Sequence, residues 1–206
     1  KVFNNVQKER DSFRNHNADV AASLKYARNI QQALLPREQF FNSVFKDNFI
    51  LYQPKDSIGG DFYTLKEQND KTVLICGDCT GHGVPGAMMT MISLNIIHNL
   101  IESKGITQPD KILDGLSAEF RLAFRSEFSS LTIDDGLELA VCTFSKNENK
   151  VQFASYRRPA LFLRGSTMEK IDADYLGISA SMPEDFTFTL KEFDLQAGDQ
   201  MYFFTD

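Results

Sequence analysis

The chain has 206 residues, of which 42% are hydrophobic and 18 are Phe, which is enough to bury the core of one domain. Its 22 basic and 28 acidic residues give a formal net charge of −6, which argues against a nucleic-acid partner, because such partners need a basic face. Three cysteines are too few for a disulfide framework, and the polar start carries no signal peptide, so the composition indicates a soluble cytoplasmic protein. The most apolar stretch, residues 87–101, contains Asn95, His98 and Asn99 and is predicted to be too short and too polar to span a membrane.

Residues 1–35 are predicted to form one helix that ends before Pro36. Apolar side chains recur in it every seven residues, at Val6, Phe13, Val20, Ala27 and Leu34. The repeat leaves two interpretations open. The helix is either an amphipathic helix that packs on its own domain, or a helix that forms a homodimer or transmits a signal.

The rest of the chain is predicted to be α+β, because strands come first, then two helices, then a run of strands with antiparallel character. Two of the early strands, 61–65 and 71–76, are joined by a polar turn and should form a hairpin. The complete set is strands at 48–53, 61–65 and 71–76, helices at 87–103 and 110–124, and strands at 137–142, 151–156, 160–163, 186–193 and 201–204.

A glycine cluster at residues 58–90 carries the chemistry, since it holds six of the twelve glycines and two aspartates that each follow a glycine. Asp61 begins one strand of the predicted hairpin and Asp78 follows the other, so both could lie at one edge of the sheet. Carboxylates ~4 Å apart at an effective dielectric near 20 repel by roughly 4 kcal/mol, which a multivalent cation would relieve. Oxygen ligands favour Mg²⁺ or Mn²⁺. The alternative is two surface aspartates beside turn glycines.

Two other patterns in the cluster are weaker. Cys76 and Cys79 have the C-x-x-C spacing of a redox pair, but a glycine-rich loop separates them from the next helix, so two cysteines beside a turn is the better interpretation. Residues 81–86 (GHGVPG) precede a helix, yet they lack both the GxGxxG pattern and the lysine of GK[ST]. His82 in this loop is therefore predicted to be a loop histidine rather than part of a nucleotide site.

Several segments resemble the bacterial metal-dependent PP2C-type serine/threonine phosphatases, in their SpoIIE/RsbU branch. Residues 54–63 (PKDSIGGDFY) and 77–87 (GDCTGHGVPGA) resemble the signature of that family. Residues 135–140 (DGLELA) resemble the DGMDIA segment of the branch, and residues 198–206 (GDQMYFFTD) resemble its GD…LFTDG. The matches run in the family's order over residues 34–206.

The resemblance implies a PP2C-like αββα sandwich of two antiparallel sheets, with two Mn²⁺ or Mg²⁺ ions at one end. It implies that Asp78 bridges both ions, that the Cys79 carbonyl binds one, and that Asp61 and Asp206 are further ligands, with Asp61 and Asp78 as the catalytic residues. The implied reaction is attack by a metal-activated water on the phosphorus of phosphoserine or phosphothreonine. The implied partner is a phosphorylated signalling protein of the anti-anti-sigma type.

The resemblance divides the chain into a linker or coiled-coil helix, residues 1–36, and a phosphatase domain, residues 37–206, that is truncated at its C-terminus relative to the family. It also implies the cytoplasmic output domain of a larger protein, which could include a membrane-attached sensor. Glu138 stands where the branch has Asp, and Ser155 and Tyr156 stand where a Gly-Ala pair is usual. These departures, with the missing C-terminal segment, favour an alternative: a catalytically silent, partner-binding regulatory module of the same fold.

Overall fold

The computed structural model describes residues 2–124, 136–175, 178, 183 and 186–206. The helices are α1 (Val2–Leu34), α2 (Glu38–Val44), α3 (Gly83–His98), the π-helical turn η1 (Asn99–Ser103) that continues α3, and α4 (Pro109–Phe124). The strands are β1 (Phe62–Gln68), β2 (Lys71–Cys79), β3 (Leu137–Ser145), β4 (Lys150–Tyr156), β5 (Ala160–Arg164), β6 (Thr167–Ile171), β7 (Lys191–Asp194) and β8 (Gln200–Phe203).

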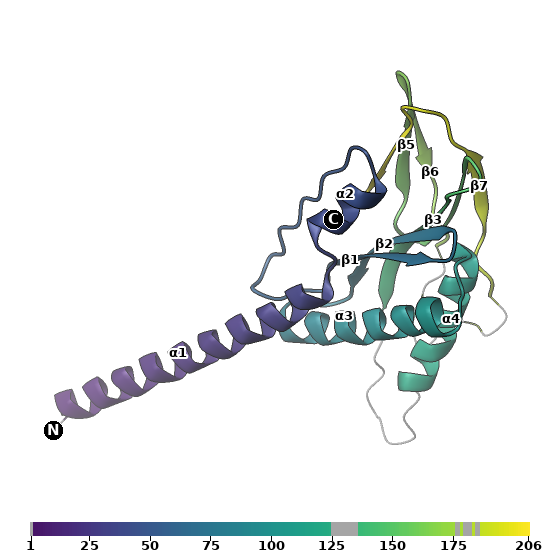
Figure 1. Ribbon diagram of the computed structural model, residues 1–206. Coiled ribbons are helices and arrows are strands. Elements are labelled where there is room, and N and C mark those ends of the chain that lie inside the picture. Colours follow the sequence, from purple (N-terminus) through teal and green to yellow (C-terminus); the bar gives the residue numbers. More distant parts are fainter. Residues whose placement is uncertain (1, 125–135, 176–177, 179–182, 184–185) are drawn as a thin grey trace.

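The strands form two antiparallel sheets, which confirms the predicted α+β class (Figure 1). The larger sheet has the order β1-β2-β3-β4-β7, and the smaller has the order β6-β5-β8. Three hairpins, β1–β2, β3–β4 and β5–β6, contribute to the two sheets. The β1–β2 turn lies at Asn69, whose φ of 56° is a left-handed conformation that Asn tolerates. The chain passes from the larger sheet to the smaller between β4 and β5.

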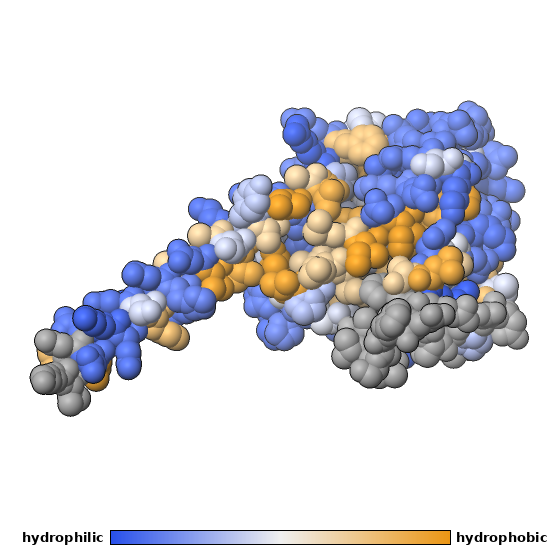
Figure 2. All heavy atoms as spheres, turned by 90° about the horizontal axis from the view of Figure 1, so that it is seen from below, coloured by the Kyte–Doolittle hydropathy of each residue, from blue (hydrophilic) through white to orange (hydrophobic). Residues whose placement is uncertain are grey.

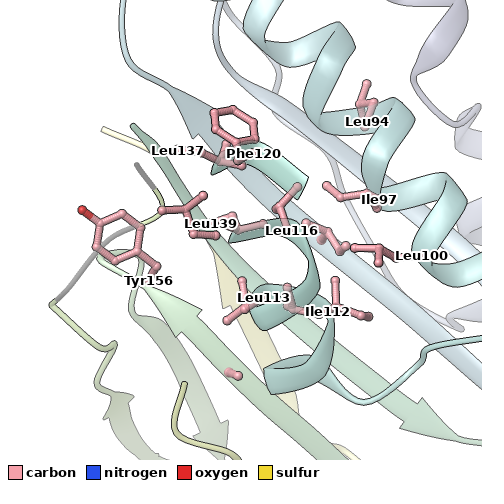
Figure 3. Close-up of a cluster of buried hydrophobic side chains, with 14 of the residues drawn as sticks. Leu94, Ile97, Leu100, Ile112, Leu113, Leu116, Phe120, Leu137, Leu139 and Tyr156 are labelled. Carbon is pink, nitrogen blue, oxygen red and sulfur yellow. The ribbon is translucent and has the colours of Figure 1, made fainter. Parts of the chain in front are cut away.

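The larger sheet is buried on both faces. On one face it packs against α3, η1 and α4, and Figure 3 shows this cluster of aliphatic and aromatic side chains between the two helices and β3. Ile97, Leu116, Phe120 and Leu139 in this cluster are fully buried. On the other face, Phe153 and its neighbours pack against Phe162 of the smaller sheet. Burial of the sheet from both sides makes it a rigid mount for residues at its strand ends.

Helix α1 projects from the domain (Figure 1). It confirms the predicted N-terminal helix, and at 1.5 Å per residue its 33 residues extend about 50 Å. Phe3, Phe13 and Val20 are exposed along it. In Figure 2 apolar side chains run along this helix and onto the face of the domain at its base.

Two predicted strands differ from the structure, and one strand was missed. Residues 48–53 form no strand in the described segment, and Phe49 and Leu51 there are 75% and 76% exposed. The strand predicted at 186–193 is confined to β7, and β6 was missed because its side chains are mostly exposed and polar.

The two predicted helices begin earlier than expected. Helix α3 starts at Gly83 rather than at residue 87, because Pro85 fits within a first helical turn, where no backbone donor is needed. Helix α4 starts at Pro109, so Asp110 lies inside the first turn and is not its cap.

Within the described residues, one helix is long and apolar enough to cross a membrane. It is the continuous helix of α3 and η1, which has 21 residues and contains an 18-residue window with a mean hydropathy of 1.3. The predicted stretch, residues 87–101, is the middle of this longer helix, and a buried core helix has the same length and composition as a membrane span. Half of the helix is buried within the domain, and Leu94, Ile97 and Leu100 contribute to the core. Core packing thus accounts for its apolar character.

Candidate active site

The β1–β2 hairpin brings Asp61 and Asp78 together. Phe62 pairs with Gly77 at the end of the ladder, and the Cys79 amide donates a hydrogen bond to the Gly60 carbonyl at 3.1 Å. Because Phe62 is paired with Gly77 in an antiparallel ladder, the next residues outward, Asp61 and Asp78, lie directly opposite each other. The predicted proximity of the two aspartates therefore follows from the strand register.

A third carboxylate joins them from β3. Glu138 is the register partner of Asp78 on its other side, so Asp61, Asp78 and Glu138 form a row across β1, β2 and β3. Cross-strand partners project from the same face of a sheet. Glu138 was left out of the predicted ligand set, and the structure places its side chain beside that of Asp78.

Arg158 connects this row to Asp206. Its Nη2 atom lies 2.7 Å from Asp78 Oδ2, 3.1 Å from Glu138 Oε2 and 2.6 Å from Asp206 Oδ1. Arg158 lies between β4 and β5, where the chain leaves the larger sheet, and Asp206 follows β8 of the smaller sheet. The Arg158 side chain is only 11% exposed. The four carboxylates of Asp61, Asp78, Glu138 and Asp206 therefore meet where the two sheets come together; we call them the carboxylate cluster.

The environment of Asp78 disfavours its ionised form. Burial, and then the charge of Asp61, raise the pKa of Asp78 to about 6 against the opposing effect of Arg158. The hydrogen bond from Arg158 lowers the pKa of Asp206. Burial lowers the pKa of Arg158 itself, but its bonds to the carboxylates raise it overall. The cluster thus holds more negative charge than Arg158 neutralises.

Close backbone contacts hold the glycine-rich loops beside the cluster. A Cβ at Gly60 would lie 2.3 Å from the Cys79 carbonyl oxygen and 3.0 Å from Asp78 Oδ1. A Cβ at Gly86, in the first turn of α3, would lie 2.4 Å from the Gly81 carbonyl oxygen. These two positions require glycine because another backbone occupies the space of a side chain. The main-chain carbonyl of Cys79, which was predicted to be a metal ligand, therefore lies next to the carboxylate cluster.

The chemistry of the cluster fits a hard divalent cation. Its donors are carboxylate oxygens and a main-chain carbonyl, the ligand types that Mg²⁺ and Mn²⁺ prefer. The guanidinium of Arg158 already lies among three of the carboxylates, which shows that they surround a point where positive charge is stabilised. Among the described residues, no group of three or more His, Cys, Asp or Glu side chains is placed so that it could hold a metal ion. The guanidinium of Arg158 lies between Asp78, Glu138 and Asp206, and these carboxylates would have to move closer together to bind a metal ion.

The other candidate groups lie around this cluster. Cys76 and Cys79 are both free thiols on β2, and burial raises the pKa of each to about 11. Such thiols are protonated at neutral pH, which gives no support to a redox pair. His82 is exposed just before α3, and its Nδ1 lies 3.0 Å from Asp56 Oδ2.

Ser155 and Tyr156, the predicted departures from the family pattern, are both buried in β4. They contribute to the interior of the domain. Asp135, the first residue of the DGLELA segment, lies outside the described residues. Arg158 was missed altogether, although it belongs to a pair of adjacent arginines directly after a predicted strand.

Comparisons with known proteins agree with this fold. Residues 68–206 match the family model of stage II sporulation protein E (SpoIIE). No curated protein gives a significant match. Among solved structures, the SiaA-PP2C domain of Pseudomonas aeruginosa is 29% identical with a TM-score of 0.79, over 91% of this chain and 72% of that chain.

Two more distant structures share the fold. The PP2C phosphatase domain of SpoIIE from Bacillus subtilis, with a fragment of its regulatory domain, is 20% identical with a TM-score of 0.54, over 69% of this chain and 39% of that one. RsbX, solved in complex with magnesium, is 11% identical with a TM-score of 0.57, over 77% of this chain and 71% of that one. The SpoIIE family model matches more than half of this chain, residues 68–206. The chain therefore belongs to the SpoIIE family, and its fold is that of the PP2C-type phosphatase domains.

Proposed function

We propose that the chain is a metal-dependent protein phosphatase that acts on phosphoserine or phosphothreonine. The observation that carries the proposal is the carboxylate cluster, where residues from both sheets meet around Arg158. Burial, and then repulsion from Asp61, raise the pKa of Asp78, and a bound divalent cation would stabilise its ionised form. Family membership supports the choice of phosphate ester hydrolysis as the reaction.

Two Mn²⁺ or Mg²⁺ ions would be held by Asp61, Asp78 and Asp206 with the main-chain carbonyl of Cys79. Such ions, when bound, activate a water for in-line attack on phosphorus and neutralise charge on the phosphoryl oxygens. The protein would contribute the fixed positions of the ligand side chains and the adjoining main chain. Asp78 lies between Asp61 and Glu138 in the ladder, and the hydrogen bond from Cys79 N to the Gly60 carbonyl fixes the adjoining main chain.

The substrate would be a phosphorylated signalling protein of the anti-anti-sigma type, as in the phosphatases that the sequence resembles. We further propose that residues 1–36 are a linker helix and that residues 37–206 are the phosphatase domain. The projection of α1 from the domain supports this division (Figure 1). The proposed location is the cytoplasm, as the output domain of a larger signalling protein.

The proposal is tested by phosphate release from a phosphoserine peptide, measured with Mn²⁺, with Mg²⁺ and with excess chelator. We expect turnover only with metal, and a loss on the order of a hundredfold in Asp78→Asn, about 2.7 kcal/mol of activation free energy. Asp19→Asn, an exposed aspartate of α1, is the matched control. Cys76→Ser should be as active as the wild type. Wild-type protein without metal-dependent turnover would contradict the proposal.

A second candidate is the catalytically silent, partner-binding module. The observation that favours it is Arg158, because its guanidinium already satisfies three of the carboxylates. In that case the ion pairs would take the place of metal. Arg158→Met separates the two functions. Mn²⁺ binding that appears in Arg158→Met but not in the wild type would support the silent module, whereas wild-type binding supports the enzyme.

A further inference from the structure

Gln31 is unusual on α1 because it is buried. Its exposed fraction is 4%, and among the α1 residues with described side chains it alone falls in the buried class. Its neighbour Gln32 is exposed. A buried amide needs partners for both its oxygen and its nitrogen, because an unsatisfied polar group in the interior is costly.

Both partners of Gln31 belong to one residue. The Nε2 atom donates to the Gly59 carbonyl oxygen at 2.6 Å, and the Gly59 amide donates to Oε1 at 3.3 Å. The side-chain amide thus holds the main chain of Gly59 as a neighbouring strand would. Glycine permits this close approach.

The next residue, Gly60, is held from two other elements. Thr90 of α3 donates through Oγ1 to the Gly60 carbonyl at 2.8 Å, and the Cys79 amide of β2 donates to the same carbonyl at 3.1 Å. Gly60 also lies against the Cys79 carbonyl and Asp78. Asp61 follows immediately, so contacts at Gly59 and Gly60 determine where Asp61 lies relative to Asp78.

We infer that Gln31 is a positioning residue for the carboxylate cluster: through its paired bonds to Gly59 it sets the place of Asp61 beside Asp78 and the Cys79 carbonyl. The inference rests on the proposed function for its consequence, metal affinity, and on the hydrogen bonds alone for its structural part. The cluster is then built from α1 as well as from the two sheets.

Substitutions at Gln31 and Gln32 test the inference as a matched pair. Gln31→Met keeps the length of the side chain but removes its donor and acceptor, and Gln31→Glu removes the donor to the Gly59 carbonyl. Gln32→Met and Gln32→Glu make the same changes at the exposed neighbour. Circular dichroism and thermal unfolding identify the temperature range in which every variant is folded.

Two readouts are measured on the folded proteins. Backbone amide hydrogen exchange should be faster at Gly59 and Cys79 in Gln31→Met than in Gln32→Met, since the first loses the bond to Gly59 and the second does not. Calorimetric titration with Mn²⁺ should show weaker binding in both Gln31 variants, on the order of tenfold, and unchanged binding in both Gln32 variants. A role limited to docking α1 would change thermal stability without changing the affinity of the folded protein for Mn²⁺.

The possible results are distinguishable. Equal exchange at Cys79 in the Gln31 and Gln32 variants would overturn the inference, whatever the metal result. Faster exchange with unchanged Mn²⁺ affinity would also overturn it, because the main chain would then move without affecting the cluster. Absence of Mn²⁺ binding in the wild type would contradict the proposed function, while the exchange comparison would still decide whether Gln31 positions this main chain.

Discussion

Asp78 interacts with the other charged groups of the site. It lies opposite Asp61 on one side and Glu138 on the other, and Arg158 bonds to its carboxylate. Burial and the neighbouring charge raise its pKa to about 6, so its ionised form is unfavourable in the folded protein at neutral pH. Because its ionised form destabilises the folded protein, we infer that Asp78 serves to bind a ligand rather than to stabilise the fold.

Asp78→Asn should therefore stabilise the metal-free protein at pH 8. The raised pKa means that the folded state binds the proton more tightly than the unfolded state, so the contribution to stability is complete below pH 3.8 and is lost as the pH rises through about 6. A shift from 3.8 to about 6 corresponds to at most ~3 kcal/mol. Urea unfolding with chelator, at pH 8 and pH 5, measures the free energy of unfolding.

The gain from Asp78→Asn should be larger at pH 8 than at pH 5, because the wild-type side chain is mostly protonated at the lower pH. Asp19→Asn on the exposed face of α1 is the control for the loss of one negative charge. Loss of stability in Asp78→Asn at pH 8 would show that the ion pair with Arg158 outweighs burial and repulsion.

The sequence predicted part of this site. Asp61 and Asp78 flank a short hairpin, so their proximity follows from local pairing alone. Glu138 and Arg158 could not be placed in the same way, because their positions depend on the register of β3 against β2 and on the route between the two sheets. Both depend on tertiary contacts between segments that are far apart in the sequence.

At the scale of elements, α1 combines two features. Its C-terminal end is fixed to the domain at Gln31, and its remaining length carries exposed apolar side chains at the heptad positions. Phe13 is 66% exposed and Val20 is 44% exposed. The two interpretations offered by the heptad repeat therefore concern different parts of the helix, and the structure supports the first of them for its base. The base packs on its own domain, and the projecting part is the proposed dimerisation surface.

We expect the chain to dimerise through the projecting part of α1, since pairing would bury the heptad side chains. Sedimentation equilibrium should show a concentration-dependent dimer in the wild type, and Phe13→Glu combined with Val20→Glu should be monomeric. Asn15→Glu, which adds a charge outside the heptad positions, should leave the dimer intact. A wild-type monomer at the highest soluble concentration would contradict this prediction.

The errors among the predicted strands share one physical cause. Residues 48–53 have the apolar character of a strand but pair with no strand among the described residues, whereas β6 has exposed polar side chains and pairs with β5. Strand formation depends on a neighbour that supplies the ladder, and local side-chain character does not contain that information. The hairpin of β1 and β2 was predicted because its partner is the next segment of the chain.

For the whole molecule, the carboxylate cluster requires both sheets to be in place. Asp61, Asp78 and Glu138 come from the larger sheet, and Asp206 follows β8 of the smaller sheet. Arg158 lies in the connection that joins them. The two layers therefore act as one rigid frame for the proposed metal ions, and family membership identifies the fold but leaves metal binding to be measured.

Calorimetric titration of chelator-stripped protein with Mn²⁺ tests this account most directly, because the account requires the carboxylate cluster to bind divalent metal. We predict saturable binding in the wild type, unchanged binding in Asp19→Asn, and affinity weaker by on the order of a hundredfold in Asp78→Asn, about 2.7 kcal/mol of binding free energy. Equal binding by the wild type and Asp78→Asn, or no binding by either, would contradict it.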